Sequence, residues 1–435
     1  MDPGLRQFLT AKARNLMYRA RRLTRLDQHS LGIRPEDRPF VPSDAHFVAA
    51  NRRLSDIDRD VRAALSAMSS AMARPDSSAQ QILAQCALVE RQVDRARRAY
   101  GLFFEVFSQR GTAFARPLSA CDTVAADCFA VVRKNAPGLL QMPLLKPVTY
   151  LEHSFSPATF RRGVLLSRLL GEQNPFPLVR IPYERIEAPW GMGVLLHEVG
   201  HNLQSDLGVW HETRLALQRR VLLISRNAWL TRIWSRWHRE IFADLCALLL
   251  GGPASARAMK DFLAYPAARV LSFRPLGVHP TPYLRIFILA EMLRRMGFAD
   301  DARVLRAVWN DLYLPHVSTA RVPQGLLITA ERLIPHVVDE VAFQPRRGLA
   351  QRALADIIPF AKEDERRIHQ GARELAQGRV PSALPPRFVV SASRVAFEQK
   401  WAPPGVIAKT VVRHLTRQLL PPAPRTAHAA IPLSA

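Results

Sequence analysis

Two histidines and a glutamate stand near the middle of the chain at a spacing suited to metal binding. In the segment GMGVLLHEVGHNLQSDLG, His197 and His201 are four residues apart and Glu198 follows the first of them. On an α-helix, side chains four residues apart share a face, so both imidazoles can reach one ion. Glu198 lies about 100° further around such a helix, where its carboxylate can take a proton from water. The spacing predicts a metal centre with His197 and His201 as ligands and Glu198 as general base.

The residues around this motif favour a buried helix over a surface helix. Buried imidazoles need partners, and a metal ion is one such partner. Solvated histidines on a surface helix are the ordinary alternative, and they would not be surrounded by apolar side chains. The apolar residues in question are Val194, Leu195, Leu196, Val199 and Leu203.

A catalytic zinc ion needs a third protein ligand and an open position for water. The metzincin pattern would place glycine at position 204 and histidine at position 207, but these positions hold Gln204 and Leu207, which excludes that pattern. His211 follows Gly208, where we expect the motif helix to end. Glu240 lies in a second apolar helix, RWHREIFADLCALLLGGP, which we expect Gly251, Gly252 and Pro253 to end. Glu240 is the better candidate for the third ligand.

A second carboxylate follows on the same expected helix. Asp244 is four residues after Glu240 and therefore on the same face, where it can accept a hydrogen bond from the free ring nitrogen of a histidine ligand. Taken alone, the two carboxylates would suggest a solvated face paired with arginines such as Arg236 and Arg239. Together with HEVGH they favour a metal ligand and its support.

A third segment, GVHPTPYLRIFILAEMLRRMGF, places His279 and Arg285 on either side of an expected helix start. Thr281 is the expected N-cap and Pro282 the first helical residue. His279 and Arg285 could both donate hydrogen bonds to the negative charge of a tetrahedral intermediate. For His279 the alternative that it only braces the loop stays open.

The three segments HEVGH, EIFAD and HPTPYLRI, in this order, resemble the prenyl-protease and HtpX family of gluzincin metallopeptidases. Sequences of that family carry HExxH, then ExxAD, then an HP segment followed by arginine. The chain departs from the family in having no transmembrane segments, a short interval before Glu240, and Leu284 in place of an acidic residue before Arg285. The resemblance implies one Zn2+ held by His197, His201 and Glu240, base catalysis by Glu198, support from Asp244, and substrate contacts from His279 and Arg285.

The expected fold is mostly α, of the α+β class, with a zincin-like helical catalytic domain, a small β-sheet, and helical N- and C-terminal extensions. Helices are predicted at residues 46–73, 77–108 and 119–134, and β-like runs begin at residues 147 and 177. The second run, PLVRIP, is the predicted exposed edge for an extended substrate. The predicted units are a helical region with a basic amphipathic start at 1–140, a metallopeptidase domain at 141–315, a helical region at 316–420 and a disordered tail at 421–435.

The chain of 435 residues has 61 basic and 37 acidic side chains, a formal net charge of +24. Such a charge attracts anionic partners in a salt-dependent way. No recognisable nucleic-acid-binding motif accompanies it, so no specific nucleic-acid partner is expected. Residues 1–26 combine spaced leucines with arginines, which predicts weak association with an anionic membrane surface. An amphipathic helix docked on the protein is the alternative.

Localisation is expected to be cytoplasmic, with peripheral membrane contact at most. No apolar run reaches the roughly 18 residues of a membrane span, and no secretory signal is present. The four cysteines form no C-x-x-C pair, which is typical of reduced thiols.

The expected function is that of a zinc-dependent endopeptidase acting on a peptide or protein substrate. The alternative is a non-enzymatic basic protein that binds anionic partners and whose zinc is structural or absent. A structural zinc site needs a fourth protein ligand, which His211 or His238 would have to provide.

Overall fold

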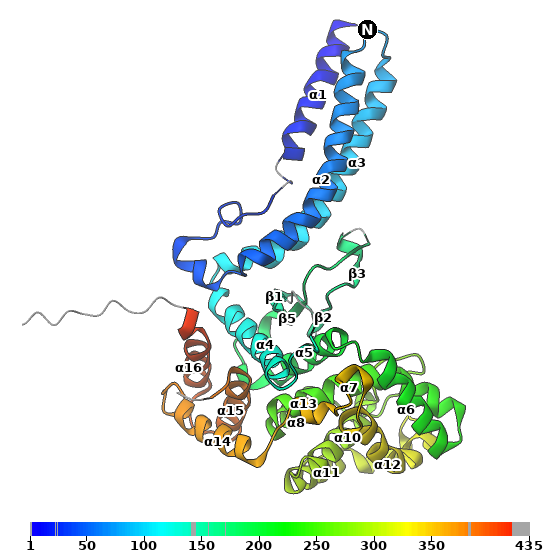
Figure 1. Cartoon of the computed structure of the whole chain (residues 1–435), viewed down its shortest axis with the longest axis vertical. Helices are drawn as coiled ribbons and strands as arrows, with labels where there is room; N and C mark the ends of the chain where they lie inside the picture. The colour runs from blue at the N-terminus through cyan, green and yellow to red at the C-terminus, as the bar shows by residue number, and fades with distance from the viewer. Residues whose placement is uncertain are drawn as a thin grey trace, which may run out of the picture.

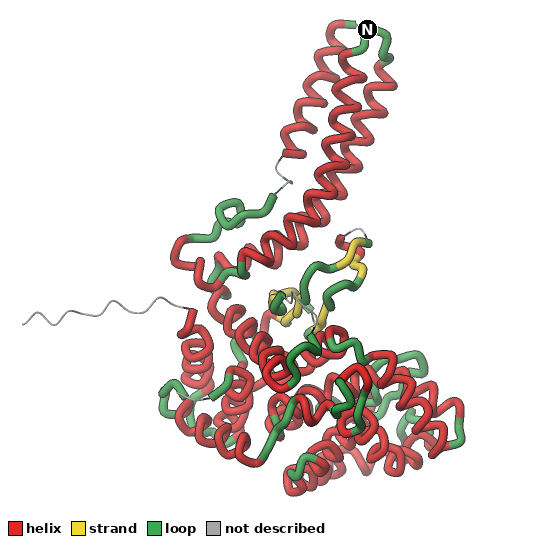
Figure 2. Tube along the Cα trace, viewed as in Figure 1, coloured by secondary structure: helices red, strands yellow, loops and turns green. Residues whose placement is uncertain are grey.

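The computed structural model describes residues 2–21, 23, 25–140, 145–154, 156–169, 171–381 and 384–419. Helices dominate this part of the chain, and a small sheet accompanies them (Figure 2). The expectation of a mostly α chain with a little β-structure is therefore confirmed. The predicted disordered tail at 421–435 lies outside the described residues.

Three long helices form an arm that projects from the rest of the molecule (Figure 1). They are α1 (Pro3–Arg21), α2 (Asp44–Ala73) and α3 (Ala79–Ser108), so the two helices predicted at 46–73 and 77–108 are confirmed. Leu9 and Leu16 of α1 are buried in the core of this arm. These contacts are the ones expected of a docked amphipathic helix, and membrane association stays a prediction.

The main sheet has three strands in the order β1-β5-β2. β1 (Val148–Glu152) runs parallel to β5 (Leu178–Pro182), and β2 (Ala158–Phe160) runs antiparallel to it. The prediction that PLVRIP forms an exposed edge is therefore wrong, because β5 is the central strand. A separate hairpin pairs β3 (Leu165–Leu166) with β4 (Glu172–Gln173).

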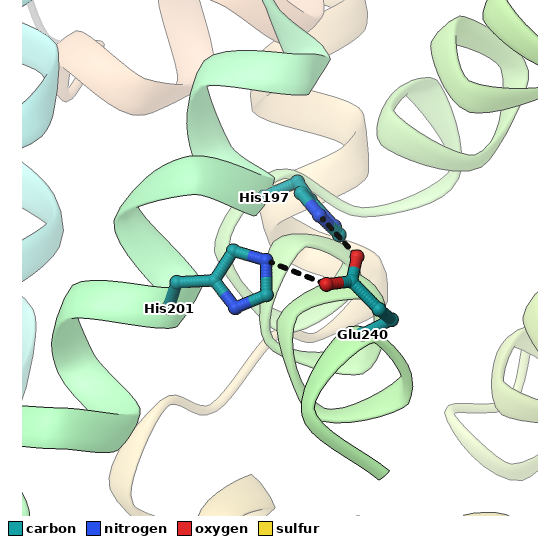
Figure 3. Close-up of side chains that lie close together, drawn as sticks. All are labelled: His197, His201 and Glu240. Carbon is teal, nitrogen blue, oxygen red and sulfur yellow. Dashed lines mark ion pairs between the residues drawn. The ribbon is translucent and has the colours of Figure 1, made fainter. Parts of the chain in front are cut away.

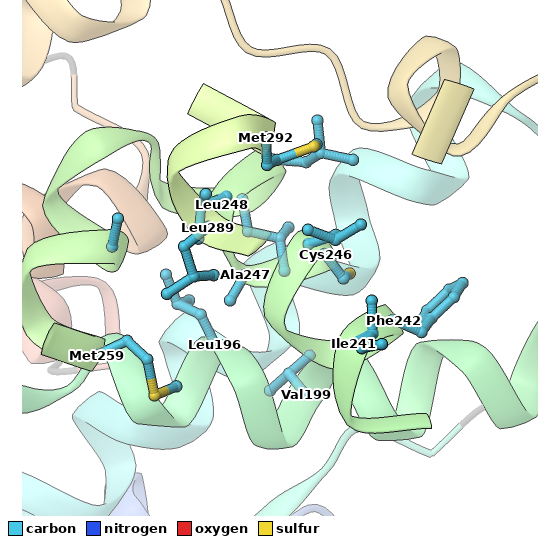
Figure 4. Packing of buried hydrophobic residues seen from close by; sticks show 14 of the residues in the cluster. Leu196, Val199, Ile241, Phe242, Cys246, Ala247, Leu248, Met259, Leu289 and Met292 are labelled. Atoms are coloured by element: carbon cyan, nitrogen blue, oxygen red, sulfur yellow. The ribbon is translucent and has the colours of Figure 1, made fainter. Parts of the chain in front are cut away.

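The helices that carry the chemical motifs pack around one core. They are α5 (Gly193–Asp206), α6 (Trp210–Ser225), α7 (Ala228–Gly251), α8 (Pro253–Leu263) and α10 (Pro282–Arg295). Figure 4 shows Leu196 and Val199 of α5 among apolar side chains of α7, α8 and α10. This apolar packing fixes α5 and α7 side by side.

The remaining helices enclose this group. α15 packs against α4, α5, α7 and α8, so a helix of the predicted C-terminal region helps to hold the motif helices. No described helix is both long and apolar enough to span a membrane. The helices not yet named are α4 (Ala115–Asn135), α9 (Ala267–Val270), α11 (Ala299–Tyr313), α12 (Gln324–Val338), α13 (Leu354–Ile357), α14 (Lys362–Ala376), α15 (Pro386–Glu398) and α16 (Pro404–Thr416).

Candidate metal centre

Helix α5 presents the two histidines of the motif. It ends at Asp206, and Gly208 follows with φ +67°, a left-handed conformation that favours glycine. The helix end expected at Gly208 is thus present. His197 is buried and His201 half-buried, and both rings point away from the α5 axis toward α7 (Figure 3).

Helix α7 brings the carboxylates to the histidines. Asn227 caps its first turn by accepting hydrogen bonds from two backbone N–H groups, and the helix ends at Gly251 as the glycine pair predicted. The approach of α7 to α5 depends on Gly200. A Cβ at this position would lie 3.0 Å from the Cα atom of Ala243 and 3.0 Å from its carbonyl oxygen.

His197, His201 and Glu240 offer ligand atoms that all lie within 4.8 Å of one another. The Nε2 atom of His197 is 3.4 Å from Oε2 of Glu240, and the Nε2 atom of His201 is 3.5 Å from Oε1 (Figure 3). The structure therefore brings together the three residues predicted as ligands, and this group could hold a metal ion.

The donor set suits zinc, and the two histidine–glutamate separations match its size. Ligand atoms about 2.0–2.1 Å from a tetrahedral zinc ion stand about 3.3 Å apart, close to the 3.4 and 3.5 Å separations of the histidine and glutamate atoms. These separations are long for direct hydrogen bonds. Oε2 of Glu240 is buried and has no hydrogen-bond partner among the described residues. A cation between the three side chains would satisfy that oxygen.

Asp244 forms a hydrogen bond with the ring nitrogen of His197 that does not face Glu240. Nδ1–H of His197 donates to Oδ1 of Asp244 at 2.8 Å, which is the hydrogen bond expected from the sequence. This bond fixes the tautomer that leaves Nε2 free for a metal. Arg285 in turn donates to both carboxylate oxygens of Asp244, at 2.5 and 2.7 Å. The predicted substrate residue Arg285 is thus buried behind Asp244, with two of its donor groups already in use.

The charges of this group shift its acid–base equilibria. Burial alone would lower the pKa of His197, but the carboxylates of Asp244 and Glu240 outweigh burial and raise that pKa to about 9. Burial would raise the pKa values of Glu240 and Asp244, yet both pKa values lie below their usual range. The neighbouring imidazoles of His197 and His201 lower that of Glu240, whereas Arg285 and His197 lower that of Asp244. The metal-free site therefore favours ionised carboxylates beside a protonated His197.

Glu198 is buried on the motif helix, with 6% of the residue exposed. Its backbone carbonyl accepts a hydrogen bond from the hydroxyl of Thr159 in β2 at 3.0 Å. Strand β2 is thereby fixed to the helical turn that carries the predicted base. Sequence reasoning missed both β2 and Thr159, because a strand of three residues has too few positions to show a pattern.

The other predicted histidines lie in three different settings. His279 is exposed, with Nε2 3.3 Å from Oε2 of Glu240, so it stands at the mouth of the site. His238 is buried, and its two ring nitrogens are within 3.4 Å of the amide nitrogen of Gln204 and within 3.2 Å of a backbone carbonyl. His211 is exposed and packs against Trp210. Neither His211 nor His238 joins the described ligand group, so that group has three members.

The chain was compared with protein-family models, curated proteins and solved structures, and none of the three comparisons gave a match.

Proposed function

We propose that the protein is a zinc-dependent endopeptidase with a zincin-like catalytic domain, a relative of the prenyl-protease and HtpX gluzincins. The observation that carries the proposal is the buried group of His197, His201 and Glu240, beside Glu198 and supported by Asp244. Three protein ligands leave a coordination position open, as catalytic zinc sites require, whereas structural sites use four.

The proposed chemistry is hydrolysis of a peptide bond by water. When bound, zinc would polarise the carbonyl of the scissile bond and lower the pKa of a water molecule to about 7. The carboxylate of Glu198 accepts the proton of the attacking water and passes it to the nitrogen of the leaving amine. His279, at the mouth of the site, donates to the oxygen on which negative charge develops.

The supporting residues keep the ligands in place. Asp244 orients the ring of His197, and Arg285 orients Asp244, so we assign Arg285 a positioning role. Among the described strands β2 pairs only with β5, so its other edge, which pairs with no described strand, is the candidate for binding an extended peptide. Because Thr159 joins β2 to the turn of Glu198, a peptide on this edge would lie across the site.

The test compares the wild type with Glu198→Gln, a nearly isosteric change that removes the base and retains the three ligands. Zinc is quantified in both proteins, and cleavage of a denatured protein mixture is followed with and without a chelator. We expect about one zinc ion per chain in both proteins and chelator-sensitive cleavage in the wild type alone.

Two outcomes would contradict the proposal. Wild type without zinc would remove the metal centre. Zinc in both proteins without cleavage of any substrate would favour the non-enzymatic alternative. Equal cleavage by both proteins would instead remove Glu198 from its role as base.

A further inference from the structure

Two arginines near the metal centre lack the partners that most arginines of this chain have. The neighbours of these residues are paired: Arg162 with Asp206, and Arg236 with a backbone carbonyl. In the described part of the chain, no hydrogen bond or ion pair engages the side chain of Arg161 or Arg239, and both residues are half-buried. Half-buried guanidinium groups without a carboxylate are costly unless a ligand supplies one.

Arg161 lies beside the turn of α5 that follows His201. At one end, the hydroxyl of Thr159 donates to the carbonyl of Glu198, and at the other Arg162 donates to Asp206 at 3.2 Å. From residue 159 to residue 162 an extended chain advances about 10 Å, and from residue 198 to residue 206 the helix rises about 12 Å. The segment after β2 therefore runs alongside α5 in the same direction. Arg161 is placed near the far end of the motif helix.

Arg239 reaches the same level from the opposite helix. Helix α7 runs antiparallel to α5, because Glu240 lies beside His201 and His238 lies beside Gln204 at 3.4 Å. Arg239 stands between these two contacts in the sequence. The two arginines thus lie at the same level of α5, about one helical turn beyond His201, one in the segment after β2 and the other on α7.

The pKa of Arg161 agrees with this placement. Burial lowers the pKa of the guanidinium, and the positive charge of Arg239 lowers it further. The positive charges of the two arginines repel each other, and a bound carboxylate would relieve the repulsion. Guanidinium groups also bind carboxylates through paired hydrogen bonds.

We propose that Arg161 and Arg239 form a carboxylate-binding subsite, so that the protein selects extended peptides with a carboxylate one or two residues from the bond that is cleaved. This inference rests on the proposed peptidase function. One turn of α5 spans about 5.4 Å, and an extended peptide advances about 3.3–3.6 Å per residue, which sets the distance of one or two residues. The carboxylate is either an acidic side chain or the C-terminus of the peptide.

Binding is measured on full-length Glu198→Gln protein with and without zinc, so that the result does not depend on turnover. The probes are labelled alanine-rich peptides in which one Glu moves through successive positions, each with a Gln partner of the same length. A second set compares a free C-terminal carboxylate with its amide. The variants are Arg161→Gln and, as a matched control, Arg232→Gln, which removes an exposed charge from α7 two turns before Arg239.

We expect Glu at one or two adjacent positions, or the free C-terminus, to bind about tenfold more tightly than its neutral partner, as is typical of charged hydrogen bonds. Arg161→Gln should bring this ratio close to one, whereas Arg232→Gln should leave it unchanged. Equal affinity of Glu and Gln peptides at every position would overturn the subsite. So would a preference that is the same at all positions and falls equally in both variants, since that is the general attraction of a chain of net charge +24. Failure of the peptidase proposal would appear separately, as missing zinc or missing cleavage in the wild type.

Discussion

Replacing Gly200 by alanine tests whether close contact between α5 and α7 holds the metal ligands in place. The new Cβ would lie 3.0 Å from the Cα atom and from the carbonyl oxygen of Ala243, and 3.3 Å from the Cβ atom of Cys246. Ordinary contacts begin at 3.4 Å, and two of these three atoms belong to backbone that cannot rotate away. Helix α7 must therefore withdraw from α5 by about 0.4 Å at this level, a shift that well-packed interiors resist.

This withdrawal exceeds what a zinc site tolerates. Ligand distances in such sites hold to within about 0.2 Å, and Glu240 is on the helix that moves. We expect zinc affinity to fall about 10–100-fold, as it does when ligand support is lost. Overpacking costs about 1–3 kcal/mol, and the better helix propensity of alanine offsets roughly 1 kcal/mol. The free energy of unfolding without metal should thus fall by only about 0–2 kcal/mol.

Zinc affinity is measured by competition with a chromophoric chelator, and stability by urea unfolding of the metal-free protein. Gly101→Ala in α3 is the control, because a Cβ at residue 101 has no atom within 4 Å. This control should gain about 0.5–1 kcal/mol of stability and keep its zinc affinity. If Gly200→Ala binds zinc as tightly as the wild type, then close contact between α5 and α7 does not hold Glu240 in position, and the prediction is refuted.

Further predictions concern the groups behind the ligands. Asp244→Asn should weaken zinc binding about 10–100-fold and destabilise the metal-free protein by about 3 kcal/mol, because Arg285 stays buried and charged. In urea unfolding, the control Asp261→Asn should change little, because it removes an exposed carboxylate from Arg394 while the ion pair of Arg394 with Glu398 remains. Zinc binding at pH 7 should release a proton, because the raised pKa of about 9 keeps His197 protonated in the metal-free site. Apparent zinc affinity should therefore rise about tenfold per pH unit from pH 7 toward 9, and binding heats should vary with the ionisation enthalpy of the buffer. A heat independent of the buffer would argue against a protonated His197.

The sequence alone determined the parts of the site that local helix geometry controls. His197, Glu198 and His201 share one helix, so their relative directions follow from 3.6 residues per turn. The same holds for Glu240 and Asp244 on α7, and the ends of both helices were readable from glycine. The mostly helical fold and the two long arm helices were predictable for the same reason.

Only the tertiary structure decided which groups meet across elements. No local pattern shows that β5 is central, that β2 lies on the turn of Glu198, or that Arg285 is buried behind Asp244. Strand order and helix contacts depend on packing between segments far apart in the chain. A sequence pattern indicates that a residue is buried, but it does not indicate which residues it contacts. The placement of Arg161 and Arg239 at the same level of α5 was likewise not predictable from the sequence. Each is one of many arginines, and only the packing of β2 and α7 against α5 places these two charges at that level.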